Sequence, residues 1–273
     1  MMRVMCLAEN TQGKFGCLYE HGLCIHIETE KHRLLSDTGA SDAFLKNAEL
    51  LGVDIEKTDT VVLSHGHYDH SGGIIPFSKL NNKAEIYMQR SAGDGYYHIY
   101  PDSKKYIGID REILSLGQVR LLDGDHKIDD ELEIFTGITE RRLQPEGNSV
   151  LQKKTDSGFT ADDFCHEQYL VIKSEGKTLL VSGCAHNGIV SILDKFRQLY
   201  GSDPDIVISG FHTMKKTDYT ENDIKLVKDI CSELMKTDIK FFTGHCTGEL
   251  PCRIMKEIMG DQLTIIRSGD ILI

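Results

Sequence analysis

Three features of the sequence predict an α/β (α+β) fold. The first third contains several short strand-like segments, one helix has well-marked ends, and several apolar segments each lead into a histidine or a cysteine. Hydrophobic residues make up 40% of the 273-residue chain and charged residues 27%, which is enough apolar material for a sizeable core. No repeat, low-complexity tract or Pro/Gly/Ser linker divides the chain, so we expect one domain over residues 1–273.

The first third is expected to be rich in β-structure. Short segments of strand character cover residues 4–8, 16–20, 24–28 and 32–36. The helix predicted over residues 43–51 has Ser41 or Asp42 as its N-cap, and Gly52 lies just past its end. Its buried stripe is expected to contain Phe44, Ala48 and Leu51.

Four later apolar segments each run directly into residues that can bind a metal. Residues 61–63 precede His65, 178–182 precede Cys184 and His186, 206–209 precede His212, and 240–243 precede His245. Consecutive apolar positions are expected of a strand buried on both faces. Because open sheets gather ligands at one edge of their strands, this recurrence favours a functional site over scattered structural histidines.

The segment 65–70, His-Gly-His-Tyr-Asp-His, carries the most specific chemical signal. In a nearly extended stretch, residues two apart point the same way, so His65 and His67 can offer their imidazoles to one ion. If the chain then turns into a helix, Asp69 and His70 can reach a second ion nearby. The segment therefore predicts metal binding.

The stretch LSHGHYDHSGG resembles the HxHxDH motif of the metallo-β-lactamase superfamily, and LLSDTGAS before it resembles the superfamily's first motif. The resemblance spans the chain and implies a four-layer αββα metallo-β-lactamase-type sandwich that holds two divalent metal ions, zinc first, with iron or manganese as alternatives. The implied ligands are His65, His67 and His166 for one metal, and Asp69, His70 and His245 for the other.

Two further positions belong to the resemblance. Cys184 falls where the superfamily's hydrolases usually carry a bridging Asp, and His186 follows two residues later, so either side chain could ligate. We place Cys184 among the metal ligands and His186 outside them. Asp37 could cap the helix entered through Ser41, but the resemblance casts it as a carboxylate that orients a ligand histidine.

The stretches GCAHNGIV, SGFHT, TGHCTG, DDFCHEQ and KKYIGI are similar to those of the dihydropterin-6-yl-methyl-ribofuranosylaminobenzene 5'-phosphate synthase-like subgroup. This resemblance implies a metal-dependent hydrolase, or a transferase, acting on a small phosphorylated or pterin-like metabolite. Two metals that share a water would lower its pKa and supply hydroxide, or would hold a leaving pyrophosphate.

Two residues near the expected metals are candidates for a catalytic role. Asp69 is the natural proton acceptor of a hydrolytic step. His212 is not needed to complete six ligands, so it is available to hydrogen-bond a phosphate or an oxyanion, although a satisfied structural histidine is an alternative.

Two segments with little periodicity are expected to cover the site. Residues 90–118 are interpreted as a cap insertion, in which Lys104 and Lys105 would bind a substrate phosphate and Tyr106 would contact the substrate ring. Solvated lysines and a core tyrosine are the structural alternatives. Residues 137–166 are expected to form an irregular functional loop.

Charge and composition limit the other classes of function. A net charge of -11 argues against a nucleic-acid partner, and so against a nuclease of the same superfamily. The start of the chain lacks secretory features and no apolar run reaches membrane-spanning length, so we expect a cytoplasmic protein with reduced thiols and no membrane partner. A non-catalytic metal-binding or sensing module and a di-iron oxidoreductase on the same ligands remain as alternatives.

Overall fold

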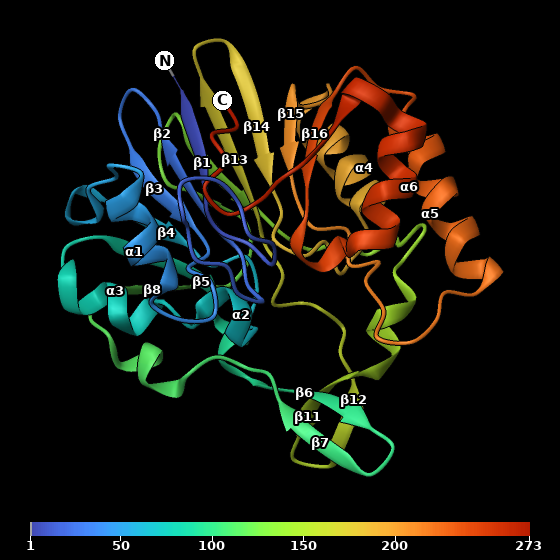
Figure 1. The fold of residues 1–273 in the computed structure, drawn as a ribbon. Coiled ribbons are helices and arrows are strands. Elements are labelled where there is room, and N and C mark those ends of the chain that lie inside the picture. Colours follow the sequence, from blue (N-terminus) through green and yellow to red (C-terminus); the bar gives the residue numbers. More distant parts are fainter. Residues whose placement is uncertain (1) are drawn as a thin grey trace.

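The computed structural model describes residues 2–273, which form two large sheets packed face to face (Figure 1). The strands of the first sheet are β1 (Arg3–Ala8), β2 (Cys24–Glu28), β3 (Arg33–Ser36), β4 (Thr60–Val62), β5 (Glu85–Gln89) and β8 (Val119–Leu122), in that spatial order. The second sheet contains β9 (His126–Lys127), β10 (Leu132–Phe135), β13 (Tyr169–Ser174), β14 (Lys177–Val181), β15 (Ile206–Ile208), β16 (Lys240–Thr243) and β17 (Leu263–Ile265). Its spatial order is β17-β16-β15-β14-β13-β10-β9.

Helices cover the outer face of each large sheet (Figure 1). The first sheet is covered by α1 (Ala43–Leu50) and α3 (Ile74–Leu80), and the second by α4 (Ile189–Tyr200), α5 (Glu221–Leu234) and α6 (Glu249–Met259). Short 3-10 helices are η1 (Ile55–Lys57), η2 (Arg90–Gly93), η3 (Arg111–Ser115), η4 (Glu146–Val150), η5 (His245–Thr247) and η6 (Gly260–Gln262).

Three buried apolar layers hold this arrangement together. One layer lies between the sheets, where Ile25 and Leu34 of the first sheet belong to the same cluster as Leu179 of the second. The other two layers lie between each sheet and its helices, around Phe44 and Phe196. The predicted four-layer αββα sandwich is therefore confirmed.

The helix predicted over residues 43–51 agrees with the structure more closely than the predicted early strands do. Helix α1 ends at Leu50, two residues before Gly52, which has a positive φ of 71°. Its N-terminal Ala43 N–H donates to the Ser41 hydroxyl at 3.1 Å. Leu51 is only half-buried, and Asn47 shares the buried face instead. The strand predicted over residues 16–20 is wrong, because the chain there is a loop that begins with positive φ at Phe15 and Gly16.

A third, smaller sheet lies apart from the two large ones, at the bottom of Figure 1. Its strands, in spatial order, are β12 (Gly158–Ala161), β11 (Leu151–Thr155), β6 (Gly95–Tyr100) and β7 (Ser103–Tyr106). The sheet combines a hairpin from the expected cap, residues 90–118, with a hairpin from residues 137–166. The second segment is thus not irregular, because β11 and β12 pair with each other and β11 pairs with β6.

Parallel strands bring the polar motif residues to one edge of the sandwich. Strands β3, β4, β5 and β8 run parallel to one another, and so do β14, β15, β16 and β17. Residues that follow their carboxyl ends are Asp37, His65, Cys184, His212 and His245. This edge is where open sheets of this kind place their sites. No helix within residues 2–273 is long and apolar enough to cross a membrane.

Candidate metal centre

The HxHxDH segment changes from extended to helical backbone in its middle. Helix α2 (Tyr68–Ser71) begins directly after His67, whose φ of -111° and ψ of 149° are extended. His65 and His67 therefore precede the turn, while Asp69 and His70 belong to the helix. All four side chains are buried, as expected for a site that excludes bulk water.

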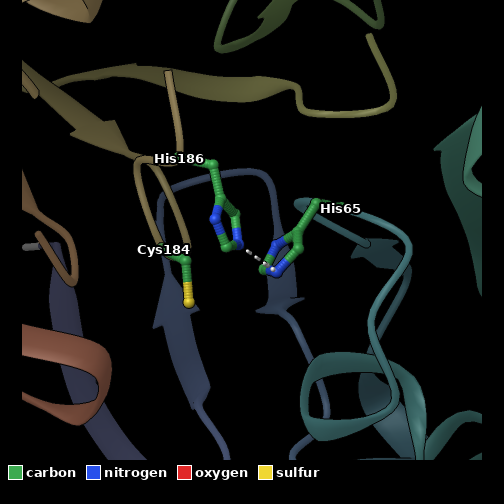
Figure 2. A group of neighbouring side chains, drawn as sticks. All are labelled: His65, Cys184 and His186. Atoms are coloured by element: carbon green, nitrogen blue, oxygen red, sulfur yellow. Dashed lines mark hydrogen bonds between the residues drawn. The ribbon is translucent and has the colours of Figure 1, made fainter. Parts of the chain in front are cut away.

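One group of possible ligands contains His65, Cys184 and His186 (Figure 2). Their ligand atoms all lie within 4.8 Å of one another, and the Nε2 atoms of His65 and His186 are 3.3 Å apart. The two rings come from the ends of β4 and β14, one in each large sheet. This group lies across the junction between the sheets.

A second group contains His70, Cys184 and His245, again within 4.8 Å. His70 Nε2 lies 3.2 Å from the Cys184 sulfur and 3.1 Å from His245 Nε2. Asp69 Oδ2 lies 3.4 Å from His245 Nε2 and 3.9 Å from His70 Nε2. Cys184 belongs to both groups, so its sulfur stands between two adjacent positions.

Asp37 determines which nitrogens of two motif histidines face the centre. Its Oδ2 accepts hydrogen bonds from His70 Nδ1 and from the Ser64 hydroxyl, both at 2.7 Å. Because the Ser64 hydroxyl donates to Asp37, its oxygen accepts from His65 Nδ1 at 2.8 Å. Both imidazoles are thereby held by Nδ1, and both turn Nε2 toward the centre. Asp37 has the contact that was expected of an orienting carboxylate.

The buried nitrogens fit a bound cation. Two imidazole lone pairs that face each other at 3.3 Å, as those of His65 and His186 do, repel unless a proton or a metal ion lies between or beside them. His67 Nε2 is also buried and, among residues 2–273, has no hydrogen-bond partner. Imidazoles together with a thiol and a carboxylate are the ligands that zinc and iron accept.

The pKa values of these histidines diverge. Burial and the neighbouring rings lower the pKa of His65, and burial lowers that of His67 to about 3. Burial also opposes charge on His70, but Asp37 outweighs it and raises the pKa of His70 to about 9. Before a metal ion binds, a proton on His70 therefore reduces the repulsion within the second group, and a metal must displace that proton.

The ligand role that the resemblance implied for His166 stays a prediction, and its ring contacts protein groups on both sides. Its Nδ1 accepts the Gly66 N–H at 2.9 Å, and its Nε2 donates to Asp162 Oδ2 at 3.2 Å. His67, Asp162 and His166 do lie within 4.8 Å of one another, but both ring nitrogens of His166 are already bonded to protein. His186, which was placed outside the ligands, faces His65 instead. His166 and His186 are therefore both candidate ligands, in different groups.

The backbone around the centre is strained. Asp37, Ala185, His212 and His245 all have positive φ, between 49° and 61°. Such conformations cost non-glycine residues of order 1–3 kcal/mol each and persist only where the surrounding structure enforces them. At Gly183 a Cβ would lie 2.1 Å from the Ser64 hydroxyl oxygen, so only glycine fits there.

A cavity of about 430 Å³ opens beside the centre, and its lining includes His67, Asp69, Cys184 and His186. Of the residues expected to bind substrate, only Lys105 lines it, with its ammonium 5.0 Å from the centre of the Tyr68 ring. Lys104 and Tyr106 lie outside the cavity lining, because side chains alternate along β7. The Lys104 ammonium lies over Phe159, and the Tyr106 hydroxyl donates to the Ile109 carbonyl.

His212 lines the cavity, and its ring centre lies 4.1 Å from that of His186. Its Nδ1 is buried and has no hydrogen-bond partner within residues 2–273. His21 was not predicted, yet its Nε2 lies 3.3 Å from Asp69 Oδ2. Lys216 and His98, also missed, lie on the cavity wall. No sequence pattern points to these three residues, because they come from loops and from the small sheet.

Residues 20–227 match the family model of the metallo-beta-lactamase superfamily, so the chain belongs to that superfamily. Two curated relatives come from Methanocaldococcus jannaschii. The 7,8-dihydropterin-6-methyl-4-(beta-D-ribofuranosyl)-aminobenzene-5'-phosphate synthase is 28% identical and is matched over 99% of this chain and 96% of its own length. The uncharacterized protein MJ0448 is 27% identical over 90% of each chain. These similarities support the subgroup that the sequence motifs indicated.

Solved structures confirm the fold. The crystal structure of Tm1679, a metal-dependent hydrolase of the beta-lactamase superfamily, is 26% identical with a TM-score of 0.83 and covers 100% of this chain and 99% of its own. The metallo-beta-lactamase fold protein YhfI from Bacillus subtilis is 16% identical, with a TM-score of 0.59 and full coverage of both chains, and supports the fold alone.

Proposed function

We propose that this protein is a dinuclear metal-dependent hydrolase or transferase that acts on a small phosphorylated or pterin-like metabolite. One observation carries the proposal, namely that Cys184 joins two fully buried groups of ligand atoms, one with His65 and His186 and one with His70 and His245, besides a third group with His212 and Cys246. The ligand atoms of each group lie within 4.8 Å of one another. Two separate structural histidine clusters would not need a shared sulfur. The thiol and imidazoles favour zinc, with iron or manganese as alternatives.

The ligand sets follow from the contacts. His65 and His186 hold the first metal, joined by His67, whose ring centre lies 4.6 Å from that of His65 and 5.0 Å from that of His186. Asp69, His70 and His245 hold the second metal, with Cys184 between the two positions. This assignment replaces the His166 of the sequence prediction with His186. Two such ions supply Lewis acidity, which polarises a carbonyl or phosphoryl oxygen of the substrate and lowers the pKa of water.

The chain's own residues handle protons and charge. Burial opposes ionisation of Asp69, but the hydrogen bond with His245 and the positive potential of His70 and His21 outweigh burial and lower its pKa. Its carboxylate is therefore ionised and serves as the proton acceptor. His212, with its free buried Nδ1 on the cavity wall, hydrogen-bonds the developing negative charge.

The cavity wall suits an anionic substrate. Lys105, Lys215 and Lys216 line the cavity together with the acidic Asp69 and Glu146, although the chain as a whole carries a net charge of -11. The Lys215 ammonium is paired with Asp223, which leaves Lys105 and Lys216 to face an anion. Positive charge concentrated in the cavity of an acidic protein attracts phosphate or carboxylate groups. One relative is named as a synthase whose product is an aminobenzene 5'-phosphate. Its name supports a phosphorylated substrate for this protein, and it makes group transfer an alternative to hydrolysis.

A metabolite screen tests the proposal. The zinc-loaded protein is incubated with phosphodiesters, phosphomonoesters, lactones and pterin pyrophosphates in ¹⁸O-labelled water, with and without an aminobenzene ribosyl phosphate as acceptor, beside the Asp69→Asn variant. Hydrolysis incorporates the label into product, whereas transfer to an aromatic acceptor does not. We expect turnover of an anionic substrate by the wild type and a large loss in the variant. No turnover of any class by protein loaded with two metals would reject the enzymatic proposal in favour of a metal-binding or sensing module.

A further inference from the structure

Two asparagines contact two of the candidate ligand histidines in the same way. Asn148 Oδ1 lies 3.0 Å from His186 Nδ1, and Asn148 Nδ2 donates to the backbone carbonyl of His186 at 2.7 Å. Asn10 Oδ1 lies 2.8 Å from His245 Nδ1, and Asn10 Nδ2 donates to the backbone carbonyl of His245 at 3.2 Å. Each amide thus holds both the ring and the backbone of a single histidine.

These contacts fix the protonation of each ring without any charged group. A backbone carbonyl only accepts hydrogen bonds, so the amide NH₂ must face it and the amide oxygen must face the ring. Because an amide oxygen also only accepts, Nδ1 of His186 and of His245 carries the proton. For Asn10 the same orientation is supported by the Gly22 N–H, which donates to Oδ1 at 3.2 Å. Both histidines therefore turn the lone pair of Nε2 toward the centre.

We propose that Asn148 and Asn10 are paired positioning residues, one for each metal position. This inference rests on the proposed dinuclear site. Asn148 holds His186 for the first metal, and Asn10 holds His245 for the second. They complete a set in which Asp37 holds His70 directly and His65 through Ser64. Neither asparagine lies in a stretch that resembles a superfamily motif.

The two asparagines come from segments that also shape the cavity. Asn148 lies in η4 between Gly147 and Ser149, both of which line the cavity. Asn10 follows β1, and its Nδ2 also lies 3.2 Å from His21 Nδ1. His21 consequently presents Nε2–H to Asp69 Oδ2, which makes it a hydrogen-bond donor to that carboxylate rather than a further metal ligand. The two asparagines therefore contact candidate metal ligands and also lie next to residues that line the cavity.

Zinc titration of Asn148→Ala and Asn10→Ala tests the pairing, with affinities read by a competing chelator. Loss of such a contact typically weakens metal binding about 10–100-fold. We expect each variant to weaken one of two zinc equivalents by that factor and to leave the other near its wild-type affinity. The exposed Asn82→Ala is the matched control. Asn148→Asp and Asn10→Asp keep an acceptor for Nδ1–H, so they should recover most of the lost affinity.

Nitrogen-15 NMR of the histidine rings gives a second readout. We expect hydrogen-bonded Nδ1–H signals from His186 and His245 in the wild type, with the His186 signal lost only in Asn148→Ala and the His245 signal only in Asn10→Ala. The pairing would be overturned by wild-type zinc affinities in both alanine variants, or by equal weakening of both zinc equivalents in each variant. It would also be overturned if His186 and His245 carried their ring proton on Nε2 in the wild type. Fewer than two zinc equivalents in the wild type would instead reject the dinuclear site, and the ring signals would still decide whether the asparagines set the tautomers.

Discussion

Replacing Asp37 with Asn tests how the buried hydrogen bonds prepare the centre for metal. The Asp37 carboxylate accepts three hydrogen bonds at 2.7 Å, from Ser64 N–H, the Ser64 hydroxyl and His70 Nδ1. An amide of the same shape has only one accepting oxygen. In one orientation its NH₂ faces His70 Nδ1, and in the other it faces the Ser64 N–H, so a donor meets a donor in either case.

The expected effects follow from these contacts. A buried donor that loses its acceptor costs about 1–3 kcal/mol of folding free energy. If the amide NH₂ faces His70, the ring must move its proton from Nδ1 to Nε2, which blocks the atom that faces the second metal position. We expect zinc affinity at that position to fall about 10–100-fold, as for other residues that orient a ligand.

The assay combines zinc competition titration with urea denaturation of Asp37→Asn, and exposed Asp261→Asn serves as the control. Because Asp37 also reaches His65 through Ser64, both zinc equivalents should weaken, the one at His70 more strongly. Wild-type affinity for both equivalents in a folded Asp37→Asn protein would refute the orienting role of this carboxylate.

Three further predictions concern stability, substrate binding and the shared sulfur. His26 is fully buried with no hydrogen bond to either ring nitrogen within residues 2–273, and burial lowers its pKa from 6.5 to about 4. Since the unfolded chain binds this proton at higher pH, stability should fall by roughly 3 kcal/mol as pH drops from 6.5 to 4, and His26→Leu should remove that loss in acid unfolding curves. Lys105→Ala should raise KM for an anionic substrate roughly tenfold, the worth of one charge-assisted hydrogen bond, whereas Lys104→Ala, which lies outside the cavity lining, should leave KM unchanged. Cys184→Ser should weaken both zinc equivalents in the titration, and weakening of only one would remove Cys184 from the shared position.

Strands of the two large sheets could be predicted because each is marked by the composition of its own short segment. Apolar runs before His65 and Cys184 have the composition of strands buried on both faces, and the structure has β4 and β14 there. The small sheet gave no such signal, since β7 is fully exposed and β11 is mostly polar. Strands of this kind are set by their partners across the sheet rather than by their own pattern.

The candidate site was predicted in part for a similar reason. The HxHxDH segment contains four of the candidate ligands within six residues, 65–70, so their spacing in the sequence is enough to bring them together. The choice between His166 and His186 depends on ring orientation. For His166 that orientation is set by the neighbouring Asp162 and by Gly66, which lies far away in the sequence. Asn10, Asn148 and His21 are ordinary polar residues in sequence, and only the fold brings them to the centre.

The most direct test of the account is the metal content of protein purified without added metal or affinity-tag nickel, measured by elemental mass spectrometry. The wild type, His67→Ala, His186→Ala and His166→Ala are compared under the same conditions. We predict about two zinc, iron or manganese ions per chain in the wild type and in His166→Ala, and fewer in the other two variants. Little metal in the wild type even after reconstitution, or metal lost from His166→Ala but retained in His186→Ala, would contradict the proposed centre.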